Sequence, residues 1–187
     1  MKLGYSGKAA VLFGLGAAII YLVMVLGTLR YLTDLALVLP FDLRPTGYSQ
    51  VDAAVLLEAL GEAGRQFYLT RQIPLDTLYP ALLALTLVST LRWRAVRFGP
   101  TLMTRMGVPL AILAATFDYL ENLGIGLMLL VGADPTLVQA ASTATMLKSA
   151  LTTAAMLAVI ATLIPILFRR LLYQPAMKSA RRSRRLS

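Results

Sequence analysis

Long apolar runs separated by short polar segments dominate the hydrophobic pattern of the chain. Each run has at least the roughly 17 residues that a helix needs to cross a hydrocarbon core about 30 Å thick. The pattern predicts an all-α integral membrane protein, built as a four-transmembrane-helix bundle. The expected membrane-spanning helices cover residues 9–29, 75–91, 108–131 and 136–168, within a single membrane domain of residues 1–175 that precedes a tail at 176–187.

The segment between the first two spans is polar overall but contains a helical pattern of its own. Val55 and Leu60 belong to a set of apolar positions that recur at helical spacing. Ser49 has the properties of an N-cap, and Asp52 stands where the acidic partner of a capping box is found. These features predict an amphipathic helix over about residues 50–70, in an extracytoplasmic loop, lying at the membrane interface or covering the bundle.

Prolines mark the expected beginnings of the last two spans. Pro109 follows Val108 and is expected in the first turn of the third span, where a proline needs no hydrogen-bond donor. Asp134 and Pro135 are predicted to be the N-cap and first residue of the fourth helix. That helix is longer than one straight crossing requires, so we expect it to tilt, to kink at Pro165 or to project beyond the membrane.

The chain carries 18 basic and 9 acidic residues, a net charge of +9, and the basic residues are concentrated beside particular spans. If four helices alternate in direction, every basic-rich segment falls on one side, so both termini are expected in the cytoplasm. Such residues are typical of anchors that contact anionic lipid headgroups, and they predict membrane lipids, not nucleic acid, as partners. The basic residues concerned are Lys2, Lys8, Arg92, Arg94, Arg97, Arg105, Arg169, Arg170, Lys178, Arg181, Arg182, Arg184 and Arg185.

Composition supports the membrane assignment and excludes several kinds of catalytic and metal-binding chemistry. Hydrophobic residues make up 58% of the chain and charged residues 14%, compared with about 25% charged in a soluble domain. Cysteine and histidine are both absent. Disulfides, thiolate catalysis, histidine acid–base chemistry, haem ligation through histidine and the usual zinc sites are therefore excluded. We expect no cofactor, and the bacterial cytoplasmic (inner) membrane is the expected location.

Three polar side chains interrupt the third apolar run. Asp118, Glu121 and Asn122 are spaced so that all three project from one helix face. Carboxyl groups inside a bilayer are costly unless they are paired, protonated or hydrated, and they often mark a functional site. Two carboxylates this close can share a proton, as general acid–base catalysts and proton carriers do. Asp118 and Glu121 are therefore the predicted catalytic residues.

Polar groups from other segments are expected at a similar depth. Lys148, inside the fourth run, is positioned to reach the carboxylates or to extend toward water. A stripe of hydroxyl side chains follows the same part of that helix. The predicted substrate-binding residues are Asn122, Lys148, Asp76, Tyr79, Ser149, Thr152, Arg44 and Tyr48.

Together these residues predict a pocket in the outer half of the bilayer that binds or transforms a lipophilic, lipid- or isoprenoid-like molecule. Several alternatives stay open. The charged residues could form a structural ion cluster, or contact a second copy of the chain or another membrane subunit. The protein could be a small proton-coupled transporter, and the hydroxyl stripe could serve only helix packing. Asp118, Glu121 and Asn122 offer few ligands for a cation, so no metal site is predicted.

Overall fold

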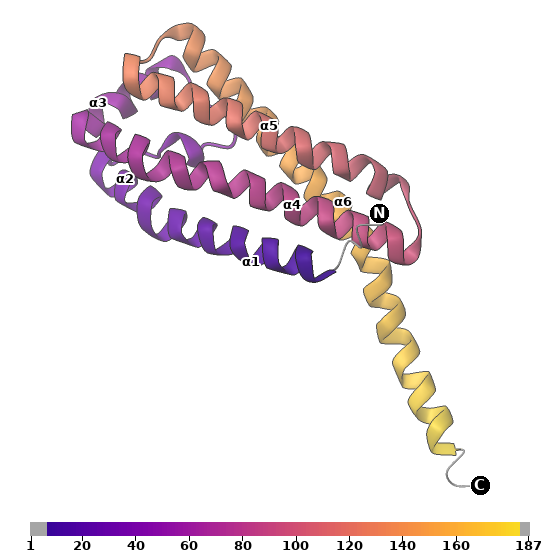
Figure 1. Cartoon of the computed structure of the whole chain (residues 1–187). Coiled ribbons are helices and arrows are strands. Elements are labelled where there is room, and N and C mark those ends of the chain that lie inside the picture. Colours follow the sequence, from indigo (N-terminus) through magenta and orange to yellow (C-terminus); the bar gives the residue numbers. More distant parts are fainter. Residues whose placement is uncertain (1–6, 184–187) are drawn as a thin grey trace.

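The computed structural model describes the backbone of residues 7–183 and the side chains of residues 7–166. Throughout this part of the chain the regular elements are helical (Figure 1). The last four residues of the basic tail lie outside the described residues. The elements are α1 (Gly7–Val23), the π-helical turn η1 (Met24–Thr28), α2 (Leu29–Ala36), the 3₁₀ turn η2 (Phe41–Leu43), α3 (Gln50–Phe67), the π-helical turn η3 (Tyr68–Gln72), α4 (Ile73–Phe98), α5 (Leu102–Val131) and α6 (Pro135–Ser183).

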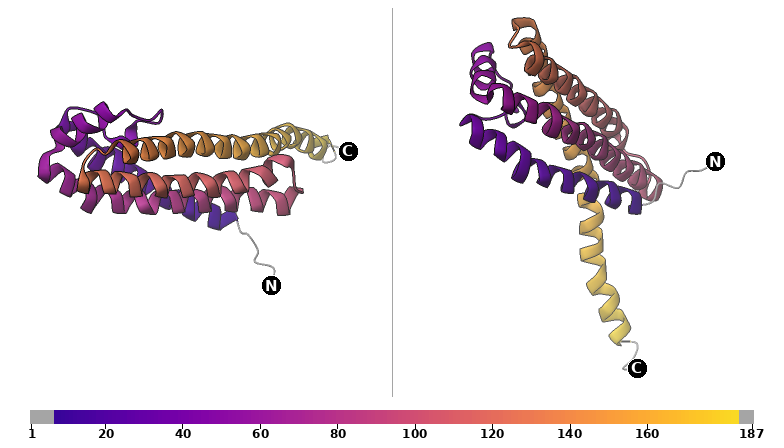
Figure 2. Two further views of the ribbon diagram at one scale, coloured as in Figure 1. Left: turned by 90° about the horizontal axis from the view of Figure 1, so that it is seen from above. Right: turned by 60° about the vertical axis from the view of Figure 1, so that its left-hand side comes forward.

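Four helical segments within the described residues are long and apolar enough to cross a membrane, which confirms the predicted number of spans and the all-α class. They are Gly7–Ala36, Gln50–Phe98, Leu102–Val131 and Pro135–Ile166. The start of α1, the connection from α4 to α5 and the projecting end of α6 share one end of the molecule, while α3 and the turn from α5 to α6 lie at the other (Figures 1 and 2). The described ends of the chain are therefore on the same side of the bundle.

The helices extend farther than the apolar runs because capping groups set their limits. Thr101 caps α5 by accepting a hydrogen bond from the Thr104 amide, and the Thr104 hydroxyl accepts one in return. Pro109 consequently lies inside α5 and not in its first turn, where it was expected. At the start of α6, Asp134 Oδ1 accepts hydrogen bonds from the backbone amides of Thr136 and Leu137, at 2.9 and 3.1 Å. The predicted cap is therefore confirmed.

The four long helices are not equally embedded in the bundle. α5 packs along α6 and against α4, and α1 packs along α4. α1 has little contact with α6, and within Gly7–Val23 only Ala17 is buried. The bundle is therefore closed along α4, α5 and α6 but loosely joined between α1 and α6.

Glycines allow the closest helix contact. A Cβ atom added at Gly124 of α5 would lie 2.7 Å from Ala141 Cβ of α6 and 3.3 Å from its Cα. Small residues of this kind let helix backbones approach closely within a membrane, where packing is a main source of association energy.

Two π-helical turns lie side by side, η1 within the first apolar helical segment and η3 within the second. In η1 the amide of Leu29 donates to the carbonyl of Met24, and in η3 the amide of Ile73 donates to that of Tyr68. The Thr28 hydroxyl donates to Gln72 Oε1 at 2.5 Å and joins the two turns. Such turns are frequent at functional sites because they redirect side chains within a helix.

The predicted capping box at the start of α3 is confirmed. The Ser49 amide donates to Asp52 Oδ2 at 2.9 Å, and the Asp52 amide donates to Ser49 Oγ at 3.1 Å. α3 then buries Leu56, Leu57 and Leu60 against the rest of the apolar core. The helix is interrupted at Gly61, which has a positive φ of 58°.

Replacing the α3 cap should lower stability measurably. Ser49→Ala removes the acceptor for the Asp52 amide and should lower the free energy of unfolding by about 1 kcal/mol. Ser49→Asn is the matched control, because asparagine also caps helices and should restore most of the loss. Denaturant unfolding in mild detergent would measure both variants. Equal stability of Ser49→Ala and the parent chain would contradict a stabilising role for this cap.

Candidate functional site

A polar cavity of about 320 Å³ lies toward the end of the bundle that contains α3, at the junction of α1, α4, α5 and α6. Tyr21 and Val25 line it from the first span, and Thr153 from α6. The polar residues of its lining include Asp42, Asp76, Tyr79, Asp118, Lys148, Ser149 and Thr152. The structure therefore brings together, from the two helices α4 and α6, five of the eight residues that were predicted to bind a substrate.

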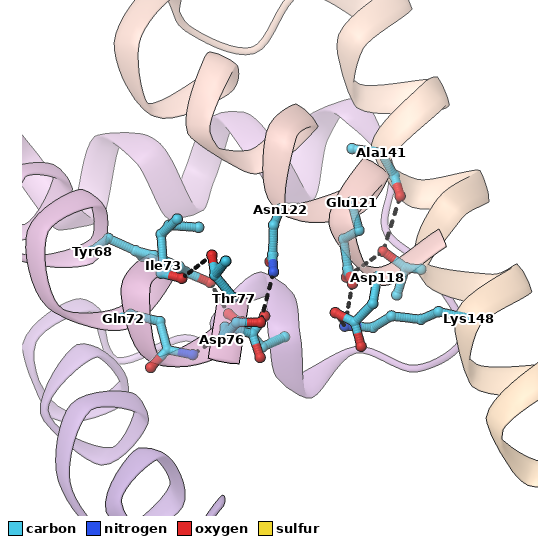
Figure 3. A network of polar contacts seen from close by, with 12 residues as sticks. Tyr68, Gln72, Ile73, Asp76, Thr77, Asp118, Glu121, Asn122, Ala141 and Lys148 are labelled. Carbon is cyan, nitrogen blue, oxygen red and sulfur yellow. Dashed lines mark hydrogen bonds and ion pairs between the residues drawn. The ribbon is translucent and has the colours of Figure 1, made fainter. Parts of the chain in front are cut away.

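Of the two positions that the sequence left open for Lys148, the structure has the one in which it pairs with the α5 carboxylates (Figure 3). Lys148 Nζ lies 3.0 Å from Asp118 Oδ1 and also contacts Glu121 Oε2. The Thr145 hydroxyl donates to the other Glu121 oxygen at 2.6 Å. Both oxygens of Glu121 thus have partners in the protein.

The two acidic residues of α5 have different surroundings. Glu121 is fully buried, with 0% of its surface exposed, and does not line the cavity. Asp118 and Lys148 do line it. A ligand in the cavity can therefore reach Asp118 and Lys148, whereas Glu121 acts on such a ligand only through Lys148.

Asp42 also lines the cavity, although it is not among the site residues predicted from the sequence. Tyr68 donates its hydroxyl hydrogen to Asp42 Oδ2, and Gln72 Nε2 donates to Oδ1 at 3.1 Å. The adjacent Phe41 is buried and packs on the Tyr48 and Tyr68 rings. This apolar anchor turns the connection between α2 and α3 inward.

Asp76 lies at the centre of the polar cluster in Figure 3 and lacks a full set of partners. Its side chain faces that of Asp42, and only 3% of the residue surface is exposed. Its Oδ2 atom has no hydrogen-bond partner among the described residues. Asn122 donates to the Asp76 backbone carbonyl at 3.0 Å, and its own Oδ1 likewise has no partner there. Asn122 therefore positions α4 relative to α5 and does not itself line the cavity.

Besides Asn122, two more of the predicted binding residues lie outside the cavity lining. Arg44 donates to the Leu39 carbonyl at 3.0 Å and pairs with Asp52 at 3.3 Å, so it holds the loop against α3. Tyr48 donates its backbone amide to Ser142 Oγ at 2.9 Å. Burial raises the pKa of the Tyr48 phenol, so this hydroxyl stays protonated at neutral pH. Neither residue is placed to touch a ligand in the cavity.

The hydroxyl stripe of α6 divides into two parts with different contacts. Ser142 and Thr145 bind other segments, through the Tyr48 amide and the Glu121 carboxylate. Ser149 and Thr152 line the cavity. Contacts between segments, one of the two alternatives that the sequence left open, therefore account for one end of the stripe, while the other end faces the cavity.

Acidic groups outnumber basic groups at this site. Among the described residues, the lining contains the carboxyl groups of Asp42, Asp76 and Asp118, with Glu121 directly behind, and Lys148 as its basic side chain. No group of three or more acidic residues in the described part of the chain is arranged to hold a metal ion. The arrangement can exchange protons with a ligand or bind a group that complements the negative charge.

A larger groove, of about 590 Å³, lies between α5 and α6 and is lined by apolar residues such as Phe117 and Leu120 together with small and hydroxyl side chains. None of its lining residues is ionisable, so it offers no acid–base chemistry despite its size. The polar cavity is therefore the candidate site. No protein-family model, curated protein or solved structure matches the chain, so the function is inferred from the geometry of this cavity.

Proposed function

We propose that the cavity binds the polar end of a lipophilic molecule that enters from the bilayer between α1 and α6. One observation carries this proposal: Asp118 and Lys148 line a cavity that is bordered by two helices with little contact between them. Tyr21, on the α1 side of the lining, is also partly exposed on the outer surface of the bundle. A molecule with an apolar chain can place its polar end in this cavity and leave its chain in lipid.

The depth of the cavity supports a ligand with a polar end. The lining residues of the first span begin at Tyr21 and end at Leu29, about 21 and 33 Å along the helix from Gly7. The start of α1, the end of α4 and the start of α5 lie at the opposite end of the bundle (Figure 1) and contain the basic residues Lys8, Arg94 and Arg105, so the positive-inside rule assigns this end to the cytoplasm. With this orientation the cavity is in the outer half of the bilayer and both termini are cytoplasmic. The proposed location of the protein is the bacterial inner membrane.

The proposed chemistry centres on Asp118. The Asp118 carboxylate can accept a proton from the ligand, and the Lys148 ammonium can donate a hydrogen bond to the ligand. Glu121 is a positioning residue, since it contacts Lys148 and Thr145 and not the cavity. Asp118 is therefore the residue that we propose for acid–base chemistry on a bound molecule.

The other two hypotheses have less support. A transporter needs access from both sides, but the space next to the cavity toward the basic end is only about 10 Å³ and is lined mostly by apolar residues such as Leu83, Leu87 and Ala111. An assembly partner that binds through the α5 carboxylates needs them on the outside, but Glu121 is buried.

Asp118→Asn tests the proposed function because it keeps the size of the side chain and removes its charge. We expect the variant to fold but to lose most of the lipophilic molecule that co-purifies with the parent chain, as measured by native mass spectrometry. Asp34→Asn is the matched control, since Asp34 is 71% exposed and pairs only with Arg30 in the described structure. Unchanged ligand occupancy in folded Asp118→Asn would show that the cavity is not the binding site.

A further inference from the structure

Building on the proposed function, we propose that the ligand carries a positively charged amine, which binds against Asp76 and Asp42 while its apolar chain extends between α1 and α6. This proposal names the chemical class of the ligand and separates it from neutral lipids, fatty acids and isoprenoid alcohols. It depends on three features of the cavity: the charge balance, an unpartnered carboxylate oxygen and an aromatic wall.

The first feature is the surplus of negative charge. Lys148 is already engaged by two carboxylates, Asp118 at 3.0 Å and Glu121 in direct contact. Asp42 and Asp76 therefore share no basic partner of their own within the described lining. A cationic group placed here would stabilise the ionised form of both carboxyl groups, so a cation is the ligand group that complements this part of the cavity.

The second feature is the state of the Asp42 and Asp76 oxygens. Both oxygens of Asp42 accept hydrogen bonds, from Tyr68 and from Gln72. Asp76 Oδ2 is buried and has no partner in the described structure. An alkylammonium group offers three N–H donors and no acceptor, which suits a site where one carboxyl oxygen, Asp76 Oδ2, still lacks a donor. A carboxylate or phosphate head would instead be repelled by the same atoms.

The third feature is the aromatic wall beside the carboxylates. Tyr79, one turn after Asp76 on α4, lines the cavity and lies against Tyr21 of α1, with ring centroids 5.7 Å apart. Tyrosine rings attract cations through their negative faces. The two rings lie where α1 and α4 border the cavity, beside the carboxyl group of Asp76.

Three probes that share one alkyl chain test the proposal directly. Full-length protein in a non-ionic detergent would be titrated with dodecylammonium, dodecanol and dodecanoate, and binding followed by native mass spectrometry. We expect dodecylammonium to bind at least about tenfold more tightly than dodecanol, with dodecanoate weakest, as the loss of a charge-assisted hydrogen bond implies.

Asp76→Asn supplies the second arm of the experiment. It should weaken dodecylammonium binding by about 10- to 100-fold and change dodecanol binding much less. Asp42→Asn should act in the same direction, and Asp34→Asn should change neither probe. If dodecanol or dodecanoate binds as tightly as the amine, the cation assignment is wrong, although the cavity still binds amphiphiles. The cation assignment is also wrong if Asp76→Asn leaves amine binding unchanged, as it would if the two aspartates simply share a proton. If none of the probes binds, the proposed function itself fails.

Discussion

Lys148→Met is expected to lower the free energy of unfolding by about 3 to 5 kcal/mol, as found when one partner of a buried ion pair is removed. Lys148 is the basic group that contacts both Asp118 and Glu121. Methionine keeps most of the apolar stem but leaves two carboxylates without a counter-charge in a low-dielectric interior. Denaturant unfolding in mild detergent, followed by circular dichroism, would measure the loss.

Removing the charges together provides the control. Lys148→Met combined with Asp118→Asn and Glu121→Gln has no buried charge left unpaired at this position, and replacing a whole buried ion cluster is often close to neutral. We therefore expect the triple variant to recover most of the stability lost in Lys148→Met. A single variant as stable as the parent chain would mean that the cluster is well hydrated and contributes little to stability.

Gly124→Ala is expected to destabilise the protein by about 1 to 3 kcal/mol, the usual effect of overpacking a tight contact. The new methyl group would lie 2.7 Å from Ala141 Cβ, and the α6 backbone is directly behind it at 3.3 Å. The helices α5 and α6 must separate to make room, which also moves Thr145 away from Glu121. The midpoint of thermal unfolding in detergent would report the change.

Gly126→Ala is the matched control on the same helix, two positions away. Its added Cβ would meet only Leu69 Cδ2, at 4.0 Å, which is an ordinary contact distance. Alanine also favours the helical conformation over glycine by about 1 kcal/mol, so this variant should be as stable as the parent chain or more stable. If both variants behave alike, the approach of α5 to α6 at Gly124 is not a tight contact.

Much of the fold was predictable because apolar length and capping chemistry are local properties of the sequence. The four spans, the Ser49 capping box and the Asp134 cap are all present. The limits of the helices were less predictable, since α4 and α5 continue through polar residues at the membrane surface. Pro109 marked an expected helix start but lies inside α5, because the cap at Thr101 comes earlier in the chain.

The candidate site was predictable only where its members share a helix or an obvious opposite charge. The spacing of Asp118 and Glu121, and the isolated charge of Lys148, indicated a cluster that the structure contains. Asp42 was missed because its place depends on the inward fold of an irregular loop and on hydrogen bonds from Tyr68 and Gln72, 26 and 30 residues away. No periodic pattern reports such contacts.

The separate environments of Asp118 and Glu121 also required coordinates. Both residues are on the same helix face, so the sequence predicts similar surroundings for them. The neighbouring α6 side chain Thr145 encloses Glu121, while Asp118 borders the cavity. Asp118 and Glu121 are thus less than one helical turn apart, yet Glu121 is enclosed and Asp118 is accessible from the cavity.

The one-sided attachment of α1 has a kinetic consequence. Because α1 packs along α4 and hardly touches α6, a modest tilt of this helix changes the width of the gap without disturbing the packing of α5 on α6. Collective helix motions of this kind occur over microseconds to milliseconds. The rate of this α1 motion would then determine the residence time of a molecule in the cavity. The polar contacts deeper inside would determine its equilibrium affinity.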